Sequence, residues 1–298
     1  QLDRGRFENA LAKHCENLGI NLISEASVRD LELAKNDSRV LFKKRGETHS
    51  LKAKWLVDAS GRTSLLKRKL GLAKSIKHRI NAAWFRIAAK INVNNWSEDE
   101  EWHKRNEYDR YLSTNHLYGK GYWTWLIPLS SGSTSIGIVA DERIHPYQTI
   151  NTFDKAREWL KRQEPQCSEM VENNIKSFQD FHALKQFSFS CKKLYSEDGW
   201  CLTGDAGMFL DPLYSPGSDF VGINNGFITD IISKFLQGQN ISQEVHEHER
   251  TFRSIFGGFL PIYENQYPTM SNSKVMSAKF IWDLIMYWGG IGPIFFNQ

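Results

Sequence analysis

The sequence predicts an α/β protein with α+β character. Three observations lead to this prediction: two short strands that each end near an acidic residue and a glycine, a run of antiparallel strands in the middle of the chain, and a helical C-terminal region. The chain has 298 residues, of which 41% are apolar, so it can bury a substantial core, and this composition excludes a disordered protein. The net charge of +4 is too small to indicate a nucleic acid as a partner.

The N-terminal part is expected to contain a helix and several hairpin strands. Apolar residues recur at helical spacing from Phe7, and Gly19 suits a C-terminal cap, which predicts a helix that ends near Leu18. Strands are expected over 20–23, 31–33, 40–43 and 51–57, and the last leads into Asp58-Ala59-Ser60-Gly61. Between Arg62 and Arg79 there are seven Lys or Arg residues and no acid. We interpret this stretch as a solvated helix and loop, with an anion-binding strip as the alternative.

The middle of the chain alternates between apolar and polar residues. Residues 84–91 predict a half-buried strand, and residues 122–128 and 134–140 flank a Ser-Ser-Gly-Ser turn. These strands predict a mostly antiparallel sheet. Two helices are expected after it, over 151–163 and 167–175.

The last third combines one strand motif with helices. A strand over 186–194 leads to a second strand that ends in Gly204-Asp205, and an apolar stripe predicts a helix from about Gly217. Residues 243–290 continue as helices rich in aromatic residues. Some of these either line a substrate cavity or belong to the core, namely Tyr263, Tyr267, Trp282, Tyr287 and Trp288.

Several kinds of site and location are excluded or disfavoured. His246-Glu247-His248-Glu249 places its histidines on different helix faces, so no metal site is expected, and neither a GxSxG nor a CxxC motif is present. Four scattered cysteines and charges from Asp3 onwards indicate a cytoplasmic protein without a signal peptide. The apolar stretch 280–296 is interrupted and too short for a membrane span.

Two glycine segments carry the chemistry. Asp58 and Gly61 follow one strand and Gly204 and Asp205 another, and ligands bind at such strand ends in α/β folds. A carboxylate there accepts hydrogen bonds from ribityl or ribose hydroxyls, and the start of the helix after 217 favours negative charge, as a reduced flavin requires. The alternative is that both acids only cap turns.

Trp123 and Trp125 lie on the same face of their expected strand. Aromatic residues of strands usually belong to the core, and this alternative remains open on periodicity alone.

Four segments together resemble the flavin-dependent halogenases (tryptophan-halogenase-like), within the class of FAD-dependent monooxygenases. They are Arg4-Gly5-Arg6-Phe7, Val57-Asp58-Ala59-Ser60-Gly61-Arg62, the Trp-Thr-Trp-Leu-Ile-Pro string at 123–128, and the segment 204–217 from Gly-Asp-Ala-Gly to Ser-Pro-Gly. The resemblance implies an FAD-binding fold of the GR2 (aromatic hydroxylase) type, with a mixed sheet, an antiparallel sheet on the substrate side and a helical C-terminal region. It implies an FAD-binding part at 1–73 and 180–240, a substrate-side part at 74–179 and a helical region at 241–298.

The resemblance also implies roles for individual residues. Residues expected near FAD are Arg4, Asp58, Gly61, Gly204, Asp205, Pro212 and Gly217. Residues expected near the substrate or halide are Trp123, Trp125, Tyr214, Ser215 and Pro216. Members of this family use reduced FAD, supplied by a separate flavin reductase, together with oxygen and halide to halogenate an electron-rich aromatic, either free or bound to a carrier. No metal is involved.

The sequence departs from the family pattern in three ways. No GxGxxG motif follows a strand, so we expect that this chain is truncated at its N-terminus and lacks the first βαβ unit together with the catalytic lysine of the family. Tyr214 replaces the glutamate of tryptophan halogenases, and a phenol with a pKa of about 10 is not an equivalent base. Pro216 has no NH for a halide, which leaves only Gly217 at this turn. Two alternatives therefore remain: an FAD-dependent aromatic hydroxylase or reductase, and a non-catalytic flavin-fold binding protein.

Overall fold

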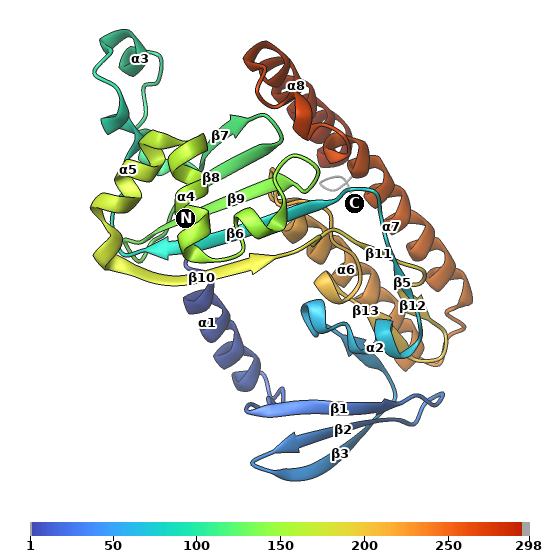
Figure 1. Cartoon of the computed structure of the whole chain (residues 1–298). Helices are drawn as coiled ribbons and strands as arrows, with labels where there is room; N and C mark the ends of the chain where they lie inside the picture. The colour runs from blue at the N-terminus through green and yellow to red at the C-terminus, as the bar shows by residue number, and fades with distance from the viewer. Residues whose placement is uncertain (1, 294–298) are drawn as a thin grey trace. The chain divides into compact units, whose positions relative to one another are not determined.

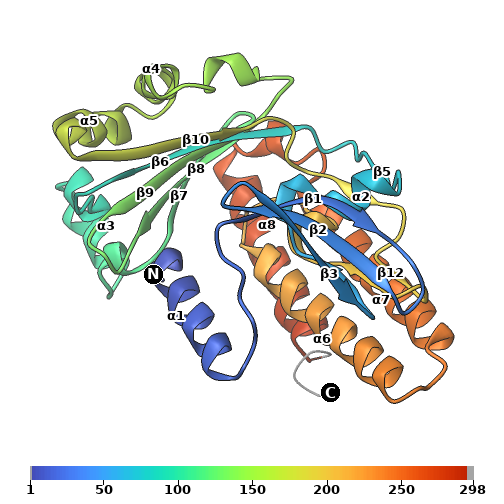
Figure 2. The same cartoon turned by 90° about the horizontal axis from the view of Figure 1, so that it is seen from below.

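A computed structural model describes residues 2–293 of the chain (Figures 1 and 2). The chain divides into two compact units, each assembled from segments that are distant in sequence. Unit 1 comprises residues 1–11, 79–187 and 264–298, and unit 2 comprises residues 12–78 and 188–263. Helix α1 (Arg4–Asn17) spans the boundary at residue 11, and its residues are exposed or half-buried.

Unit 1 is built on a five-stranded antiparallel sheet. Its spatial order is β10 (Phe178–Leu184), β6 (Ile80–Ile87), β9 (Thr134–Asp141), β8 (Tyr122–Pro128) and β7 (Asn115–Gly119). Helices α4 (Phe153–Gln163) and α5 (Pro165–Asn173) cover one face of the sheet (Figure 2), where Trp159 and Leu160 pack against buried Phe85 and Ile136. The expected antiparallel sheet is therefore confirmed.

The remaining helices of unit 1 are mostly short. They are η2 (Val93–Trp96), α3 (Glu100–Lys104), η3 (Arg110–Leu112), η4 (Tyr147–Thr149), η5 (Ile175–Ser177), η7 (Tyr267–Thr269), α8 (Ser273–Met286) and the π-helical turn η8 (Tyr287–Ile291). Along α8 most large apolar side chains are exposed, and Trp282 is 65% exposed. Within residues 2–293, no helix is both long and apolar enough to cross a membrane.

Unit 2 contains three small sheets. The hairpin strands β1 (Ala26–Glu32), β2 (Ser38–Lys44) and β3 (Glu47–Ala53) form the first, and β5 (Ala73–Lys74) pairs with β11 (Ser190–Cys191) in the second. In the third, β12 (Tyr195–Ser196) lies beside β13 (Trp200–Leu202), which pairs in parallel with β4 (Leu56–Asp58). Short helices η1 (Gly61–Thr63), α2 (Leu65–Lys69) and η6 (Gly204–Ala206) follow the strands.

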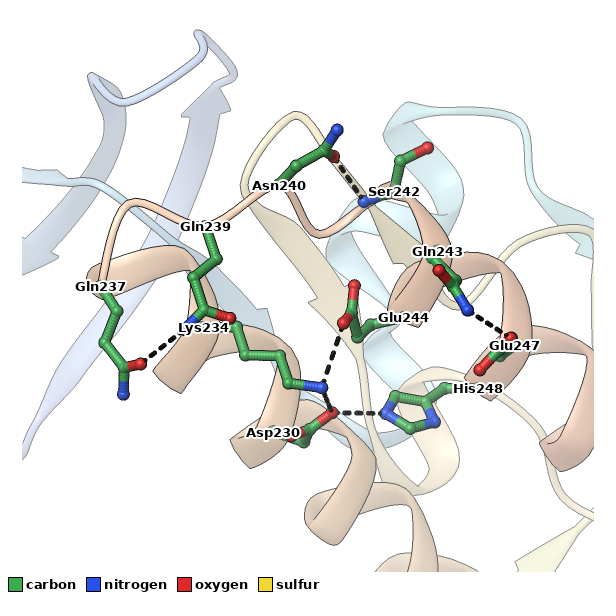
Figure 3. A network of polar contacts seen from close by, with 10 residues as sticks. All are labelled: Asp230, Lys234, Gln237, Gln239, Asn240, Ser242, Gln243, Glu244, Glu247 and His248. Carbon is green, nitrogen blue, oxygen red and sulfur yellow. Dashed lines mark hydrogen bonds and ion pairs between the residues drawn. The ribbon is translucent and has the colours of Figure 1, made fainter.

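Two long helices complete unit 2, α6 (Pro216–Leu236) and α7 (Ser242–Tyr263). Phe220 of α6 packs against Phe252, Phe256 and Phe259 of α7, because these residues recur at helical spacing on facing sides. At the other end, Lys234 bridges Asp230 and Glu244 at 3.1 Å each (Figure 3). The His-Glu-His-Glu segment belongs to this contact, since His248 also bonds Asp230 at 2.8 Å.

The structure corrects several predicted elements. Residues 20–23 are irregular and largely exposed rather than a strand, and the expected strand 186–194 contains only the two residues of β11. Strands β7 and β10 were not predicted. They form the two edges of the sheet, where pairing on only one side leaves no clear apolar alternation to detect.

Candidate functional site

The two glycine turns of unit 2 lie side by side. Strands β4 and β13 pair in parallel with Leu202 opposite Asp58, and the amide of Thr203 donates to the carbonyl oxygen of Asp58 at 3.0 Å. Because both strands end at the same sheet edge, the turns that follow them are neighbours. This is the position where α/β folds bind ligands.

The Asp58 carboxylate shapes the first turn. It accepts hydrogen bonds from the amides of Ser60 at 2.9 Å and Leu66 at 2.7 Å, so it fixes the turn and satisfies one of the first two amides of α2. This geometry matches the alternative that the acid caps a turn. Gly61 has a φ of +61°, and no described atom lies within 4 Å of the place of a Cβ, so a ligand can approach the backbone here.

The second turn carries a carboxylate among cationic side chains. Gly204 has a φ of +56° and is followed by the half-buried Asp205. Burial lowers the pKa of the Arg62 guanidinium, and the charge of Asp205 opposes that shift. The two turns are thus coupled electrostatically as well as through the backbone.

Lys67 is a site residue that the sequence reasoning missed. Its ammonium donates to the carbonyl oxygen of Gly207 at 3.0 Å and lies 3.9 Å from the ring centre of Phe189. Burial lowers its pKa to about 8, opposed by the charges of Cys191, Asp58 and Asp205. Lys67 is buried, so the interpretation of the basic stretch as a solvated helix and loop is wrong for this residue. The sequence signal that could have identified it is the run of Lys and Arg residues without an acid.

The segment from 211 to 217 forms a strained turn before α6. Asp211 is buried, bonds His78 at 2.7 Å and accepts from the amide of Leu213 at 2.9 Å. Tyr214 and Ser215 both have left-handed backbones, with φ of +66° and +58°, which costs energy in non-glycine residues. The amide of Ser215 donates to the carbonyl of Pro212 at 2.9 Å, and Pro216 begins the helix.

The chemistry of these turns fits a nucleotide cofactor, while the space within unit 2 is small. Four kinds of group lie close together here: the Asp205 carboxylate, the cations Arg62 and Lys67, the left-handed glycines Gly61 and Gly204, and the start of α6. The hollow lined by Gly204, Asp205 and Gly217 measures about 10 Å³, which is room for about one water. It is too small for a cofactor ring, which has to lie outside it.

Trp123 and Trp125 lie on one face of β8 in unit 1, as predicted. Their rings are 5.6 Å apart, and the buried Trp123 donates from Nε1 to the Tyr267 hydroxyl at 2.9 Å. Trp125 donates to Ser135 at 3.1 Å and rests on Gly137, where a Cβ would lie only 2.1 Å from the indole. Both rings are therefore firmly positioned.

The other expected residues have simpler surroundings. Arg4 lies in the unit 1 part of α1, where its exposed guanidinium pairs with Glu8 at 2.6 Å. Of the C-terminal aromatics, Tyr263 and Tyr267 are buried, whereas Trp282 and Trp288 are exposed. The core interpretation is therefore correct for the tyrosines at 263 and 267 and wrong for the two tryptophans.

Comparison with known proteins gives a consistent result. The family model described as tryptophan halogenase matches residues 1–273. The flavin-dependent halogenase chlA of Dictyostelium discoideum is 25% identical over 95% of this chain and 46% of its own length. A brominase of 1H-pyrrole-2-carbonyl-[peptidyl-carrier protein] from Pseudoalteromonas luteoviolacea is 29% identical over 80% of this chain and 56% of its own length. The chain thus spans about half the length of these curated relatives.

Solved structures show the same fold. The flavin-dependent brominase Bmp2 has a TM-score of 0.70 and 23% identity, covering 93% of this chain and 69% of its own. The halogenase PltM, solved with phloroglucinol and FAD, has a TM-score of 0.69 and 17% identity, covering 83% of this chain and 50% of its own. These likenesses confirm the expected α/β fold of FAD-binding halogenases.

Proposed function

This chain belongs to the tryptophan halogenase family, and from that premise we propose that it is part of an FAD-dependent oxidoreductase of the flavin-dependent halogenase type. The reaction uses reduced FAD, oxygen and halide to halogenate an electron-rich aromatic. When bound, FAD supplies the electrons for oxygen activation, and the protein supplies binding and orientation.

The observation that carries this proposal is the parallel pairing of β4 with β13. It places the Asp58–Gly61 turn beside the Gly204–Asp205 turn, near the start of α6. We assign FAD binding to residues of these turns, of the segment from 211 to 217 and of α1, namely Arg4, Asp58, Gly61, Gly204, Asp205, Pro212 and Gly217. Asp205 accepts hydroxyl hydrogen bonds of the cofactor, while Arg62 and Lys67 balance its charge.

The substrate side of the proposal concerns five residues: Trp123, Trp125, Tyr214, Ser215 and Pro216. The substrate is a small aromatic or a carrier-bound one, as in the relative from Pseudoalteromonas luteoviolacea, which brominates a carrier-bound pyrrole. A separate flavin reductase supplies the reduced cofactor, and the enzyme works in the cytoplasm as a monooxygenase-like protein. Residues 1–73 and 180–240 form the FAD-binding part, 74–179 the substrate side and 241–298 the helical region.

The turn at Pro216 favours a second candidate, an FAD-dependent aromatic hydroxylase or reductase. Proline has no amide hydrogen, and the amide of Ser215 is bonded to the Pro212 carbonyl. Of residues 215–217, Gly217 alone then has an amide hydrogen to donate to a halide at this turn. Weak halide binding would divert the activated oxygen to hydroxylation.

Product analysis separates these candidates. The complete gene product is incubated with FAD, a flavin reductase, oxygen and bromide. The substrates are indole, phenol and a carrier-bound pyrrole, and the masses of the products are measured by mass spectrometry. Brominated product supports the halogenase, and hydroxylated product without bromine supports the second candidate. If FAD neither copurifies nor binds, the chain is a non-catalytic flavin-fold protein and both candidates fail.

A matched pair of variants tests the cofactor residues. Asp205→Asn weakens FAD binding by roughly 10- to 100-fold, because a charge-assisted hydrogen bond contributes about 1.5–3 kcal/mol. Asp198→Asn, at an exposed position of the same unit, leaves the affinity unchanged. Equal affinities for the two variants would remove Asp205 from the site.

A further inference from the structure

Unit 1 contains a cavity of about 690 Å³ that lies between strand β7 and helix α8. We name it the β7–α8 cavity, and its residues all belong to unit 1. The volume lies within the range of small-molecule sites. None of the residues assigned above to cofactor, halide or substrate lines it.

The α8 side of the cavity contains apolar residues that suit a flat ring, beside Ser271, Ser273 and Ser277. Met270 and Met276 are 2% and 7% exposed, and Phe280 lies one turn of α8 beyond Met276. Methionine thioethers are polarisable and form favourable contacts with aromatic rings. This side therefore favours an aromatic ligand over an aliphatic one.

The β7 side of the cavity presents polar groups that are mostly uncharged at neutral pH. Burial lowers the pKa of His116 to about 4 and raises the pKa of Tyr118 to about 12. The imidazole Nδ1 and the phenol oxygen of these residues are 3.2 Å apart. Both side chains are thus neutral hydrogen-bonding groups held in a fixed arrangement.

Glu164 adds an acceptor to the lining of the cavity and sets its charge preference. It accepts a hydrogen bond from the Tyr122 hydroxyl at 2.8 Å, and burial raises its pKa. Among the described residues, no lysine or arginine lines the cavity. A ligand carboxylate would meet a carboxyl group without a compensating cation.

One residue that lines the cavity, His116, contacts the paired tryptophans. The ring of His116 is 4.9 Å from the ring of Trp123, which lies 5.6 Å from Trp125. A ligand bound against His116 is thus one ring away from the strand that we assign to the substrate side.

We propose that the β7–α8 cavity binds a neutral aromatic that carries an NH or OH donor, and that it discriminates against the corresponding carboxylates. The inference rests on the proposed function, because it identifies this ligand with the aromatic substrate. The ring lies on Met270 and Met276, and the donor faces Glu164 and the His116–Tyr118 pair.

Methyl NMR of the complete gene product tests this directly. The methionine methyls are labelled and titrated with indole and, separately, with indole-3-acetate. We expect indole to shift Met270 and Met276 and to leave Met208 of unit 2 unchanged. Indole-3-acetate binds at least tenfold more weakly. Equal binding of both probes, or no shift at 270 and 276, overturns the proposal.

Two neighbouring positions of α8 supply a matched control. Ser277 lines the cavity, so Ser277→Trp fills it and weakens indole binding at least tenfold. Ala278 is exposed and does not line the cavity, so Ala278→Trp changes binding less than twofold. If Ser277→Trp binds indole as tightly as the native protein, indole binds elsewhere and the inference is wrong.

Flavin titration of the same samples separates the two failures. FAD binding without shifts at Met270 and Met276 defeats the cavity and leaves the proposed function in place. Shifts at these methionines without FAD binding defeat the proposed function, and the cavity then remains as a binding site for neutral aromatics only.

Discussion

The amide of Thr203 donates a hydrogen bond to the carbonyl oxygen of Asp58 at 3.0 Å. This bond extends the parallel pairing of β13 with β4 by one residue and joins the two turns of the candidate cofactor site. Each turn is then fixed locally: the first by the Asp58 carboxylate, the second by the hydrogen bond from Lys67 to Gly207. The site therefore depends on these few contacts within unit 2.

Replacing Asp58 tests the first turn. In Asp58→Asn the amide group offers one acceptor oxygen in place of two, so the amide of Ser60 or Leu66 loses its partner. We expect a loss of about 1–3 kcal/mol in the free energy of unfolding, measured by urea denaturation. Asp198→Asn at an exposed position should stay within about 0.5 kcal/mol of the native protein. Equal stability of the two variants would contradict the role of Asp58.

Lys67 predicts a pH-dependent stability. Its folded pKa of about 8 lies below the ordinary 10.5, so between these values the unfolded chain binds a proton that the folded protein does not. Stability due to this group therefore rises with pH across that window. Relative to Lys67→Met, the native protein should gain about 2–3 kcal/mol between pH 8 and 10.5, measured by urea denaturation. Lys74→Met, at an exposed position, should show no such gain; a flat difference for both variants refutes the prediction.

His116 predicts a loss of stability in acid. Its folded pKa of about 4 lies below the ordinary 6.5, because burial disfavours the imidazolium. As pH falls from 6.5 to 4 the unfolded chain gains a proton that the folded protein does not, and the folded state loses about 2–3 kcal/mol. Denaturation of His116→Phe should show a smaller acid loss than the native protein, whereas the exposed His246→Phe should behave like native. An imidazole that titrates near 6.5 by NMR would disprove this.

Gly137 supports the position of Trp125. A Cβ at residue 137 would lie 2.1 Å from the indole, so Gly137→Ala must displace the ring and should cost about 1–3 kcal/mol. Gly226, inside α6, has no described atom within 4 Å of its Cβ position, and Gly226→Ala should stabilise by about 0.5–1 kcal/mol. Thermal unfolding with tryptophan fluorescence checks both changes. A neutral Gly137→Ala would show that Trp125 is not held at this place.

Local pattern was sufficient for the elements with strong periodicity. Strand β8 has the predicted bounds at 122 and 128, and α6 begins within one residue of the prediction, because Pro216 and the apolar stripe mark its start. The edge strand β10 and the irregular residues 20–23 were misjudged. Their short apolar runs contain no information about a partner strand, and pairing decides whether such a run becomes a strand.

The sequence by itself determined the family, the α/β class and the chemical types at both glycine turns, because these depend on residue identity and short spacings. Only the tertiary structure decided that the Asp58 carboxylate accepts hydrogen bonds from backbone amides, that Lys67 is buried against Phe189, and that His116 and Glu164 line one cavity. The contacts of Lys67 with Phe189 and the shared cavity of His116 and Glu164 join residues far apart in the chain, whereas Asp58 bonds amides two and eight residues away. The long-range relations arise from strand pairing and side-chain packing, which no local pattern encodes.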